Sequence, residues 1–197
     1  MASASFNLSN QFLIAMPGML DDSFAGTVVY LCEHSERGAL GLMINKPTDI
    51  KLQGLFDKVE LPLGRADLKD APVFHGGPVQ TERGFVLHEA LQEESTEKPE
   101  PVYASTMMIP GGLDMTTSKD VLEDLASGSG PKRILVTLGY SAWAQGQLES
   151  EISENSWLIV HADPSVIFET PVDQRYDKAL ALLGLQAWML SPDAGHA

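Results

Sequence analysis

The sequence contains a single cysteine, Cys32, and no long run of apolar residues. One cysteine excludes an intrachain disulfide, and nothing in the cysteine content points to an oxidising compartment. A membrane-spanning helix needs roughly 18 or more consecutive apolar residues, and no stretch approaches that length. The first basic side chain is Arg37, so the basic region that opens a signal peptide is missing. We therefore expect a soluble, cytoplasmic protein with no membrane partner.

Lysine and arginine are scarce. The 197 residues carry 13 basic and 27 acidic side chains, a formal net charge of −14. Residues 91–197 alone hold 16 acidic and 6 basic residues, a net charge of −10, and the densest basic pair in the chain is Lys132-Arg133. Proteins that bind nucleic acid through its phosphates need clustered lysine and arginine. The sequence therefore disfavours nucleic acid as a partner.

The common cofactor and metal motifs are also missing. There is no G-x-G-x-x-G pattern and no phosphate-binding loop that ends in Gly-Lys-Ser or Gly-Lys-Thr. No two of the five histidines have the spacing that places two metal ligands on one face of a helix. We expect no cofactor and no metal ion.

The apolar residues, 44% of the chain, are enough to fill the core of one domain. Runs rich in β-branched and aromatic residues predict strands at 27–32, 39–44, 83–88, 102–109, 132–138 and 157–161, the first two as an antiparallel hairpin ended by Pro47. Apolar residues three or four positions apart predict helices at 48–60, around Leu122, around Leu148 and at 173–183. Strands outnumber helices, so we expect an α+β fold with a mixed sheet rather than a regular doubly wound fold.

The domain boundaries follow from composition. Residues 12–190 are predicted to form one α+β domain, after a loose N-terminal leader at 1–11 and before a C-terminal tail at 191–197. The acidic, proline-containing segment 92–101 is the predicted flexible loop.

Two pairings allow nucleophilic catalysis in principle. Cys32 and His34 are two apart, so an extended chain would place them on one side of a strand, where an imidazole activates a thiol. The alternative is a buried cysteine at a strand end. Ser141 follows a predicted strand, but the segment 139–143 lacks the final glycine of the G-x-S-x-G motif. We assign no catalytic residue.

Two further features have a binding and a structural interpretation. Glu149 and Glu151 are two apart on a predicted helix, so their carboxylates point in different directions and cannot share one substrate atom. The turn at 75–78 has two glycines before a proline, which permits either a tight turn or a ligand lying against bare backbone amides.

Residues 138–149 concentrate aromatic, glycine and amide residues at what we predict to be a strand-to-helix junction. Within this stretch, Trp143 and Leu148 are predicted to be packing anchors. Tyr140, Gln147 and Glu149 are the better candidates for ligand contact.

Several motifs occur together in one order along the chain. They are Met16-Pro17-Gly18-Met19 with Asp22 and Phe24, Glu33-His34 with Gly38-Ala39, Gly41 and Asn45-Lys46-Pro47, Gly76-Gly77-Pro78-Val79 with Arg83-Gly84-Phe85 and Leu87-His88, Gly139-Tyr140 with Trp143, Gly146-Gln147-Leu148-Glu149 and Glu151-Ile152, and Asn155 with Trp157-Leu158. This set resembles the YqgE/AlgH family of small bacterial proteins. The resemblance implies a single α+β domain with a complex, strongly bent or bifurcated sheet flanked by a few short helices. It transfers no catalytic residues.

We predict that the polar, glycine and aromatic residues at the strand ends converge on one concave binding surface. The candidate residues are Glu33, His34, Asn45, Lys46, His75, Gly76, Gly77, Arg83, His88, Tyr140, Trp143, Gln147 and Glu149. The favoured function is a cytoplasmic module that binds a small molecule or a protein partner, with an indirect role in gene regulation. One alternative is a hydrolase-type enzyme with acid/base chemistry in a strand-end cleft. A direct transcription regulator is the other, and the charge of −14 opposes it.

Overall fold

The computed structural model describes residues 7–19, 21–91 and 101–190. The strands are β1 (Gln11–Ala15), β2 (Val28–Ser35), β3 (Gly38–Met43), β4 (Pro47–Lys51), β5 (Pro72–His75), β6 (Val79–Glu89), β7 (Thr106–Ile109), β8 (Leu113–Thr116), β9 (Ile134–Ala144) and β10 (Trp157–His161). The α-helices are α1 (Leu52–Lys58), α2 (Asp120–Ala126), α3 (Gln147–Ser153), α4 (Pro164–Phe168) and α5 (Arg175–Ala181). Short 3-10 helices lie at Ala66–Leu68, Val172–Gln174 and Ala187–Leu190.

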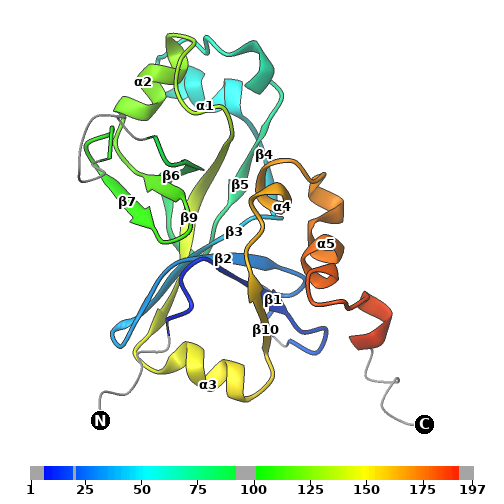
Figure 1. Cartoon of the computed structure of the whole chain (residues 1–197). Coiled ribbons are helices and arrows are strands. Elements are labelled where there is room, and N and C mark those ends of the chain that lie inside the picture. Colours follow the sequence, from blue (N-terminus) through cyan, green and yellow to red (C-terminus); the bar gives the residue numbers. More distant parts are fainter. Residues whose placement is uncertain (1–6, 20, 92–100, 191–197) are drawn as a thin grey trace.

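The long strand β9 joins the two halves of the sheet. At Thr137 it pairs with β6 on one edge and with the parallel strand β5 on the other, whereas its last residues, 141–144, pair antiparallel with β3. Figure 1 shows β9 running from the part of the molecule that carries α1 and α2 to the part near α3. The predicted single α+β fold with a mixed, bifurcated sheet is confirmed, and the sheet divides along β9.

The turn at 75–78 lies where the sheet divides. The Gly76 N–H donates to the Leu138 carbonyl oxygen of β9 at 2.9 Å. A Cβ atom on Gly77 would lie only 2.1 Å from the carbonyl carbon of Tyr140. Both glycines are therefore explained by the close approach of two backbones, because any side chain would collide there. The Gly76 amide is occupied within the fold and is not open to a ligand.

Strand β10 forms one end of the strand order β10-β1-β2-β3-β9-β6-β8-β7. It pairs antiparallel with β1 in a continuous register from Gln11 opposite His161 to Ala15 opposite Trp157. This pairing places two segments side by side that lie more than 140 residues apart in the sequence. The predicted hairpin is also confirmed, since β2 pairs antiparallel with β3.

Three hydrophobic clusters fill the interior. The first lies between the sheet and helices α4 and α5 and includes Phe12 and Tyr30. The second lies beside α3 and includes Trp143 and Trp157. The third lies under α1 and α2 and includes Phe56. None of the helices in the described ranges is long and apolar enough to cross a membrane.

Some predicted boundaries were wrong. Residues 47–51 form β4, which pairs with β5, so the helix predicted at 48–60 begins only at Leu52, and Pro47 begins a strand rather than following one. The strand predicted at 132–138 continues to Ala144, because the positive φ of Gly139 bends the strand without ending it. In the described part of the segment predicted as a leader at 1–11, Leu8 is only 5% exposed and β1 begins at Gln11. Strands β1, β4, β5 and β8 and helix α4 were not predicted. Residues 1–6, 92–100 and 191–197 lie outside the described part of the chain.

Candidate functional site

The structure brings two of the predicted site residues together in one contact. His34 on β2 is buried, and its Nε2 atom lies 2.6 Å from Oε1 of Glu149 in the first turn of α3. Its Nδ1 atom accepts a hydrogen bond of 3.0 Å from the backbone N–H of Leu8. Because Nδ1 accepts a hydrogen bond, the ring proton is on Nε2, and this N–H donates a hydrogen bond to the carboxylate. Both ring nitrogens are thus used to tie the N-terminal segment and α3 to β2.

The charge on Glu149 is stabilised by these surroundings. Its own backbone N–H at the start of α3, and then the donor from His34, hold the pKa of this carboxyl below its usual range. An ionised carboxylate at a helix N-terminus is electrostatically favourable. The pair therefore fastens the helix to the sheet.

Of the two interpretations of Cys32, the structure confirms the buried strand cysteine and not a pair with His34. A register shift between Leu31 and Glu33 interrupts the alternation of side chains along β2. Cys32 lies in the first hydrophobic cluster, whereas His34 contacts Leu8 of the second cluster. Burial raises the pKa of the Cys32 thiol far above its usual value. A bulge redirects side chains in this way, and it leaves Cys32 as a core residue.

Ser141 is likewise a buried strand residue. It lies within β9, and its hydroxyl donates to the Gly76 carbonyl oxygen at 3.1 Å. Ser141 was predicted to follow the strand but lies within it; the strand-to-helix junction predicted within 138–149 lies between Ala144 and Gln147.

Asn45 and Lys46 hold loops in place. The Asn45 side chain accepts from the Val28 N–H and donates to the Gly26 carbonyl oxygen, both at 2.9 Å. The Lys46 carbonyl oxygen accepts from the His75 N–H at 2.7 Å. These contacts explain the residues of this motif as connections between β2, β3 and β5.

His88 and Arg83 lie on β6. The His88 ring is buried, with its Nδ1 2.7 Å from the Glu89 carbonyl oxygen and its Nε2 2.8 Å from the Thr116 hydroxyl. Arg83 is exposed, and its guanidinium lies 5.7 Å from the centroid of the Phe85 ring. His88 is thus a satisfied core histidine, while Arg83 faces solvent.

The predicted site residues on β2, β9 and α3 are likewise either packed into the core or exposed to solvent. Trp143 is buried in the second cluster, as predicted for a packing anchor, and Tyr140 packs edge-on against Phe85. Gln147 is exposed, and its side-chain oxygen accepts from the Ala144 N–H at 3.0 Å. Glu33 is exposed on β2.

The predicted residues do not meet on one concave surface. His34 contacts Glu149 of α3, whereas His88 contacts Thr116 at the end of β8, just before α2, and Figure 1 places α3 and α2 at opposite ends of the molecule. Arg83 lines an open pocket on β6 with Gln80, Thr81 and Glu82. In the described ranges, no group of three histidine, cysteine or acidic residues is arranged to hold a metal ion.

A different set of residues forms the most distinctive pocket. Its volume is about 580 Å³, within the range of roughly 300–1,000 Å³ that is usual for ligand sites. Its lining comes from the loop after β1 and from the C-terminal end of α3, with one residue of the last 3-10 helix. These residues, which we call the acidic pocket, are Met16, Pro17, Gly18, Met19, Asp21, Phe24, Glu151, Glu154, Asn155, Ser156 and Leu190.

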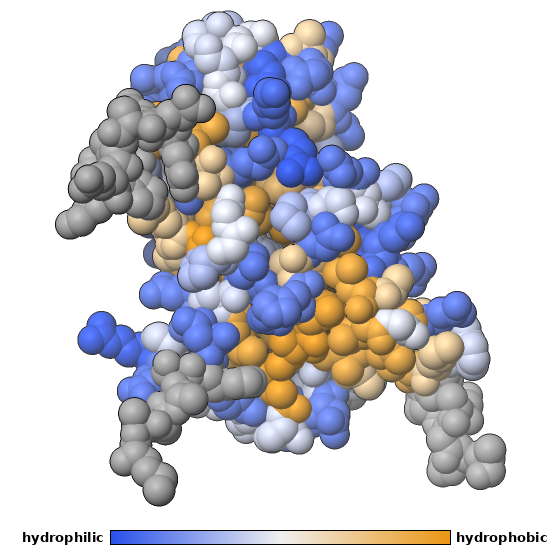
Figure 2. All heavy atoms as spheres, in the orientation of Figure 1, coloured by the Kyte–Doolittle hydropathy of each residue, from blue (hydrophilic) through white to orange (hydrophobic). Residues whose placement is uncertain are grey.

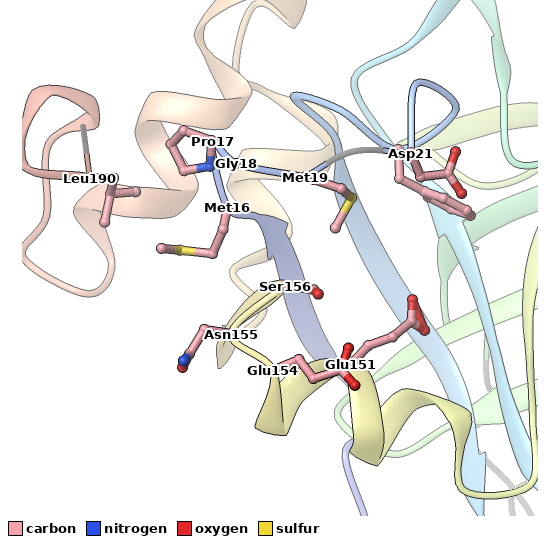
Figure 3. A pocket seen from close by; sticks show the side chains of 11 residues that line it. Met16, Pro17, Gly18, Met19, Asp21, Glu151, Glu154, Asn155, Ser156 and Leu190 are labelled. Carbon is pink, nitrogen blue, oxygen red and sulfur yellow. The ribbon is translucent and has the colours of Figure 1, made fainter. Parts of the chain in front are cut away.

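The two sides of the acidic pocket are distant in sequence. Strands β1 and β10 bring them together, since Ala15 lies opposite Trp157 and the Met16 N–H donates to the Ser156 carbonyl oxygen at 2.9 Å. Figure 3 shows the thioether of Met19 and the carboxylate of Asp21 on the loop side, with Glu151 and Glu154 on the α3 side. The lining contains three acidic side chains and no basic one.

Glu151 is the most perturbed group in this pocket. Burial raises the pKa of its carboxyl, the indole groups of Trp157 and Trp143 lower it, and the nearby Asp21 raises it again. Within the described residues, neither Glu151 Oε2 nor Trp157 Nε1 completes a hydrogen bond, although both atoms are buried. Because the Trp157 and Trp143 indoles act on this carboxyl, its buried oxygen faces the indoles, while the half-buried Glu151 side chain lines the pocket.

Aromatic rings form the wall behind this carboxyl. Phe24 lies 5.7 Å from Trp157 and 6.0 Å from Trp143, and the two indoles are 6.0 Å apart, measured between ring centroids. Of these rings, Phe24 lines the pocket. The pocket therefore combines carboxylates with an aromatic and thioether surface.

Asn155 explains how α3 ends at the pocket. It adopts a left-handed conformation with φ +59°. Its N–H bonds to the Ile152 carbonyl oxygen, and the Ser156 N–H bonds to the Glu151 carbonyl oxygen. This is the Schellman pattern that ends helices, and asparagine tolerates the conformation it needs. The turn fixes Glu151 at the mouth of the pocket.

The sequence contained a signal for this pocket in the motifs of the family resemblance, but not in its local patterns of secondary structure. Met16-Pro17-Gly18-Met19, Glu151 and Asn155 all belong to the motifs of the family resemblance. Apart from the resemblance, Glu151 was considered only in relation to Glu149. The prediction that these two carboxylates point in different directions agrees with the structure, since Glu149 meets His34 and Glu151 lines the pocket.

Comparison with known proteins places the chain in a family. The family model described as AlgH-like, DUF179, matches residues 12–188. The chain is 72% identical to a UPF0301 protein of Polaromonas sp. and 72% identical to one of Acidovorax sp., in each case over 195 residues that cover 99% of this chain and 98% of the relative.

Two solved structures have the same fold. The solution structure of the AlgH protein from Pseudomonas aeruginosa is 43% identical, with a TM-score of 0.76 and complete coverage of both chains. A Corynebacterium diphtheriae protein shares the fold at 19% identity, with a TM-score of 0.69 over 88% of this chain and 85% of that one. From the family model and the close relatives, this chain belongs to the AlgH-like (YqgE/AlgH) family.

Proposed function

We propose that this protein is a cytoplasmic binding module with a regulatory role, and that the acidic pocket binds a cationic group with an apolar stem. The observation that carries the proposal is the set of three carboxylates, Asp21, Glu151 and Glu154, that line a pocket of about 580 Å³, with Glu151 half-buried there. A buried carboxylate is stabilised by an opposite charge that shares its desolvated surroundings.

The remaining lining fits the same ligand class. Asp21 and Glu154 add negative charge, and the chain as a whole carries −14. Such a field attracts cations and repels phosphates. Met16, Met19 and Phe24 offer soft apolar contacts to the stem of an amine, and aromatic faces also attract cations.

The alternatives have less support. A hydrolase-type mechanism would need acid and base groups within reach of a substrate. The pair His34 and Glu149 does not line the acidic pocket, and both ring nitrogens of the histidine are engaged within the fold. A direct transcription regulator would need a basic face. An indirect effect on gene expression would instead pass through the ligand or partner bound at the acidic pocket.

A matched pair of small probes tests this proposal. Pentylamine and pentanol share an apolar stem, and only the first is charged at neutral pH. We expect pentylamine to bind with a dissociation constant in the millimolar range, about −4 kcal/mol, and pentanol at least tenfold more weakly. Amide chemical shifts should change near the pocket during an NMR titration.

A test substitution and a control substitution each remove one negative charge. Glu151→Gln should weaken pentylamine binding at least tenfold, whereas Glu123→Gln on the exposed side of α2 should leave it unchanged. Equal binding of the two probes, or equal effects of the two substitutions, would contradict the proposal.

A further inference from the structure

Strand β10 has an edge that is left unpaired. In the described part of the chain, β10 is the terminal strand of the order and pairs only with β1. Long, flat, apolar edges are ready templates for another strand, so proteins usually protect them with charges, prolines or bulges. The central residues Trp157-Leu158-Ile159-Val160 contain neither charge nor proline, and the register with β1 has no bulge.

The register shows which backbone groups point outward. The Met16 N–H donates to the Ser156 carbonyl oxygen before β10, and the Ala162 N–H donates to the Asn10 carbonyl oxygen after it. Hydrogen-bonded pairs alternate along an antiparallel ladder. The even-numbered residues of β10 therefore face β1.

The odd-numbered residues Trp157, Ile159 and His161 accordingly direct their N–H and C=O groups away from β1. In the ranges the structure describes, these groups bond to no other element. They present a donor and an acceptor at every second residue, the spacing that an added strand requires.

The side chains beside this edge are apolar. Leu158, Ile159 and Val160 are each half-buried, neither covered nor fully exposed. Figure 2 shows a continuous hydrophobic area in the region where Figure 1 places β10 and α5. An exposed apolar area of this kind marks an interaction site.

The edge leads directly into the acidic pocket. Glu154, Asn155 and Ser156 line the pocket, and Trp157 is the next residue and the first of β10. A chain lying along β10 would therefore place one of its ends at Glu151 and Glu154.

We propose that this protein binds an extended, basic peptide segment of a partner protein as an additional strand antiparallel to β10, with a lysine or arginine near the peptide's C-terminal end held in the acidic pocket. In this arrangement, the backbone hydrogen bonds provide affinity and the cation in the pocket provides specificity and register. The inference rests on the proposed function, since it names the source of the cationic group.

Charge selects a basic partner over a second copy of this chain. Two copies paired antiparallel about Ile159 would bring Glu154 and Asp163, which flank β10, close together at each end of the joined edge. Each copy also carries −14, and its β10 has no lysine or arginine to place in the pocket. Like charges brought close together oppose such pairing.

Three peptide probes test the inference on the full chain. The parent is acetyl-Val-Thr-Val-Thr-Lys-amide, the second carries N-methyl groups on alternate residues, and the third has norleucine in place of lysine. We expect the parent to bind at least tenfold more tightly than pentylamine. Each change should then weaken binding about tenfold, through the loss of edge hydrogen bonds or of the charge.

A variant of the edge gives a second measurement. Ile159→Pro removes an outward N–H and leaves the ladder with β1, a position that edge strands tolerate for proline. It should weaken the parent peptide at least tenfold and leave pentylamine binding unchanged. The N-methylated peptide changes the probe rather than the protein, so that comparison holds even if this variant does not fold.

The outcomes separate the two proposals. Suppose that pentylamine binds, but the parent peptide binds no more tightly and the N-methylated peptide binds equally well. The strand-addition inference is then overturned, and the proposal for the acidic pocket is retained. If neither probe binds, both proposals fail. A dimer that protects the β10 amides without peptide would assign the edge to a second copy and overturn the inference as well.

Discussion

Replacing His34 by asparagine or by glutamine separates its two hydrogen bonds. Asparagine retains an acceptor near the position of Nδ1, facing the Leu8 N–H, and loses the donor to Glu149. Glutamine retains a donor that reaches toward Glu149 and leaves the Leu8 N–H without its acceptor. The two variants therefore measure which contact stabilises the fold.

The structure sets the expected magnitudes. The bond from Leu8 to His34 is buried, so removing its acceptor should cost about 1–3 kcal/mol. The Glu149 side chain is 43% exposed, so water replaces the lost partner and the cost should stay below about 1 kcal/mol. We expect His34→Gln to be less stable than His34→Asn by about 1 kcal/mol.

Urea unfolding followed by tryptophan fluorescence provides the assay, because Trp143 and Trp157 are both buried in the native protein. With a slope of about 2 kcal/mol per molar urea, the two midpoints should differ by roughly 0.5 M. Equal midpoints, or a lower midpoint for His34→Asn, would refute the assignment of the buried bond as the stabilising one. The slope itself should not change between the variants.

Three more predictions follow from buried groups. Gly77→Ala should destabilise the protein by more than about 3 kcal/mol, seen as lost soluble yield and lost circular dichroism, because the new Cβ would collide with the Tyr140 backbone. Cys32 should not react with a disulfide reagent in the native state and should react fully in urea, since burial raises the pKa of its thiol; rapid native reaction would show that β2 opens readily. Because burial raises the pKa of Glu151, the folded state retains its proton at higher pH than the unfolded state does, so the free energy of unfolding should fall as pH rises above about 4.5. In Glu151→Gln this slope should be smaller, whereas the affinity of the wild type for pentylamine should rise with pH over the same window.

Local patterns predicted those elements whose stability is decided by nearby residues. Strands β2 and β10 have runs of β-branched and aromatic residues, so their strand character was visible. The apolar spacing of Leu52 and Phe56 marked α1, but it did not show that the residues before it pair with β5. Pairing partners are set by tertiary structure, which overrides such local preferences.

The glycines misled the prediction for a related reason. Gly139 and Gly77 were interpreted as ends or turns, as glycines usually are. In the fold they allow β9 to bend and a second backbone to cross it closely. Close approach of backbones depends on residues more than 50 positions apart and has no local signature.

The candidate site illustrates the same limit. Polar residues at strand ends were predicted to share a surface. Instead, His34, Asn45 and His88 each form hydrogen bonds with groups in a different part of the fold. The acidic pocket depends on the pairing of β1 with β10, which joins the two ends of the domain. Only the order of the family motifs connected these segments in the sequence.

The pairing of β1 with β10, together with the central place of β9, has a consequence for biosynthesis. Strand β3 ends at Met43, but its partner β9 begins only at Ile134. Strand β1 likewise pairs with β10, which begins only at Trp157. At translation rates of about 5–20 residues per second, the apolar strands β1 to β3 remain without these neighbours for on the order of 10 s. The nascent chain therefore exposes an apolar, aggregation-prone hairpin until β10 has been synthesised. This protein should depend on chaperones more during synthesis than after it.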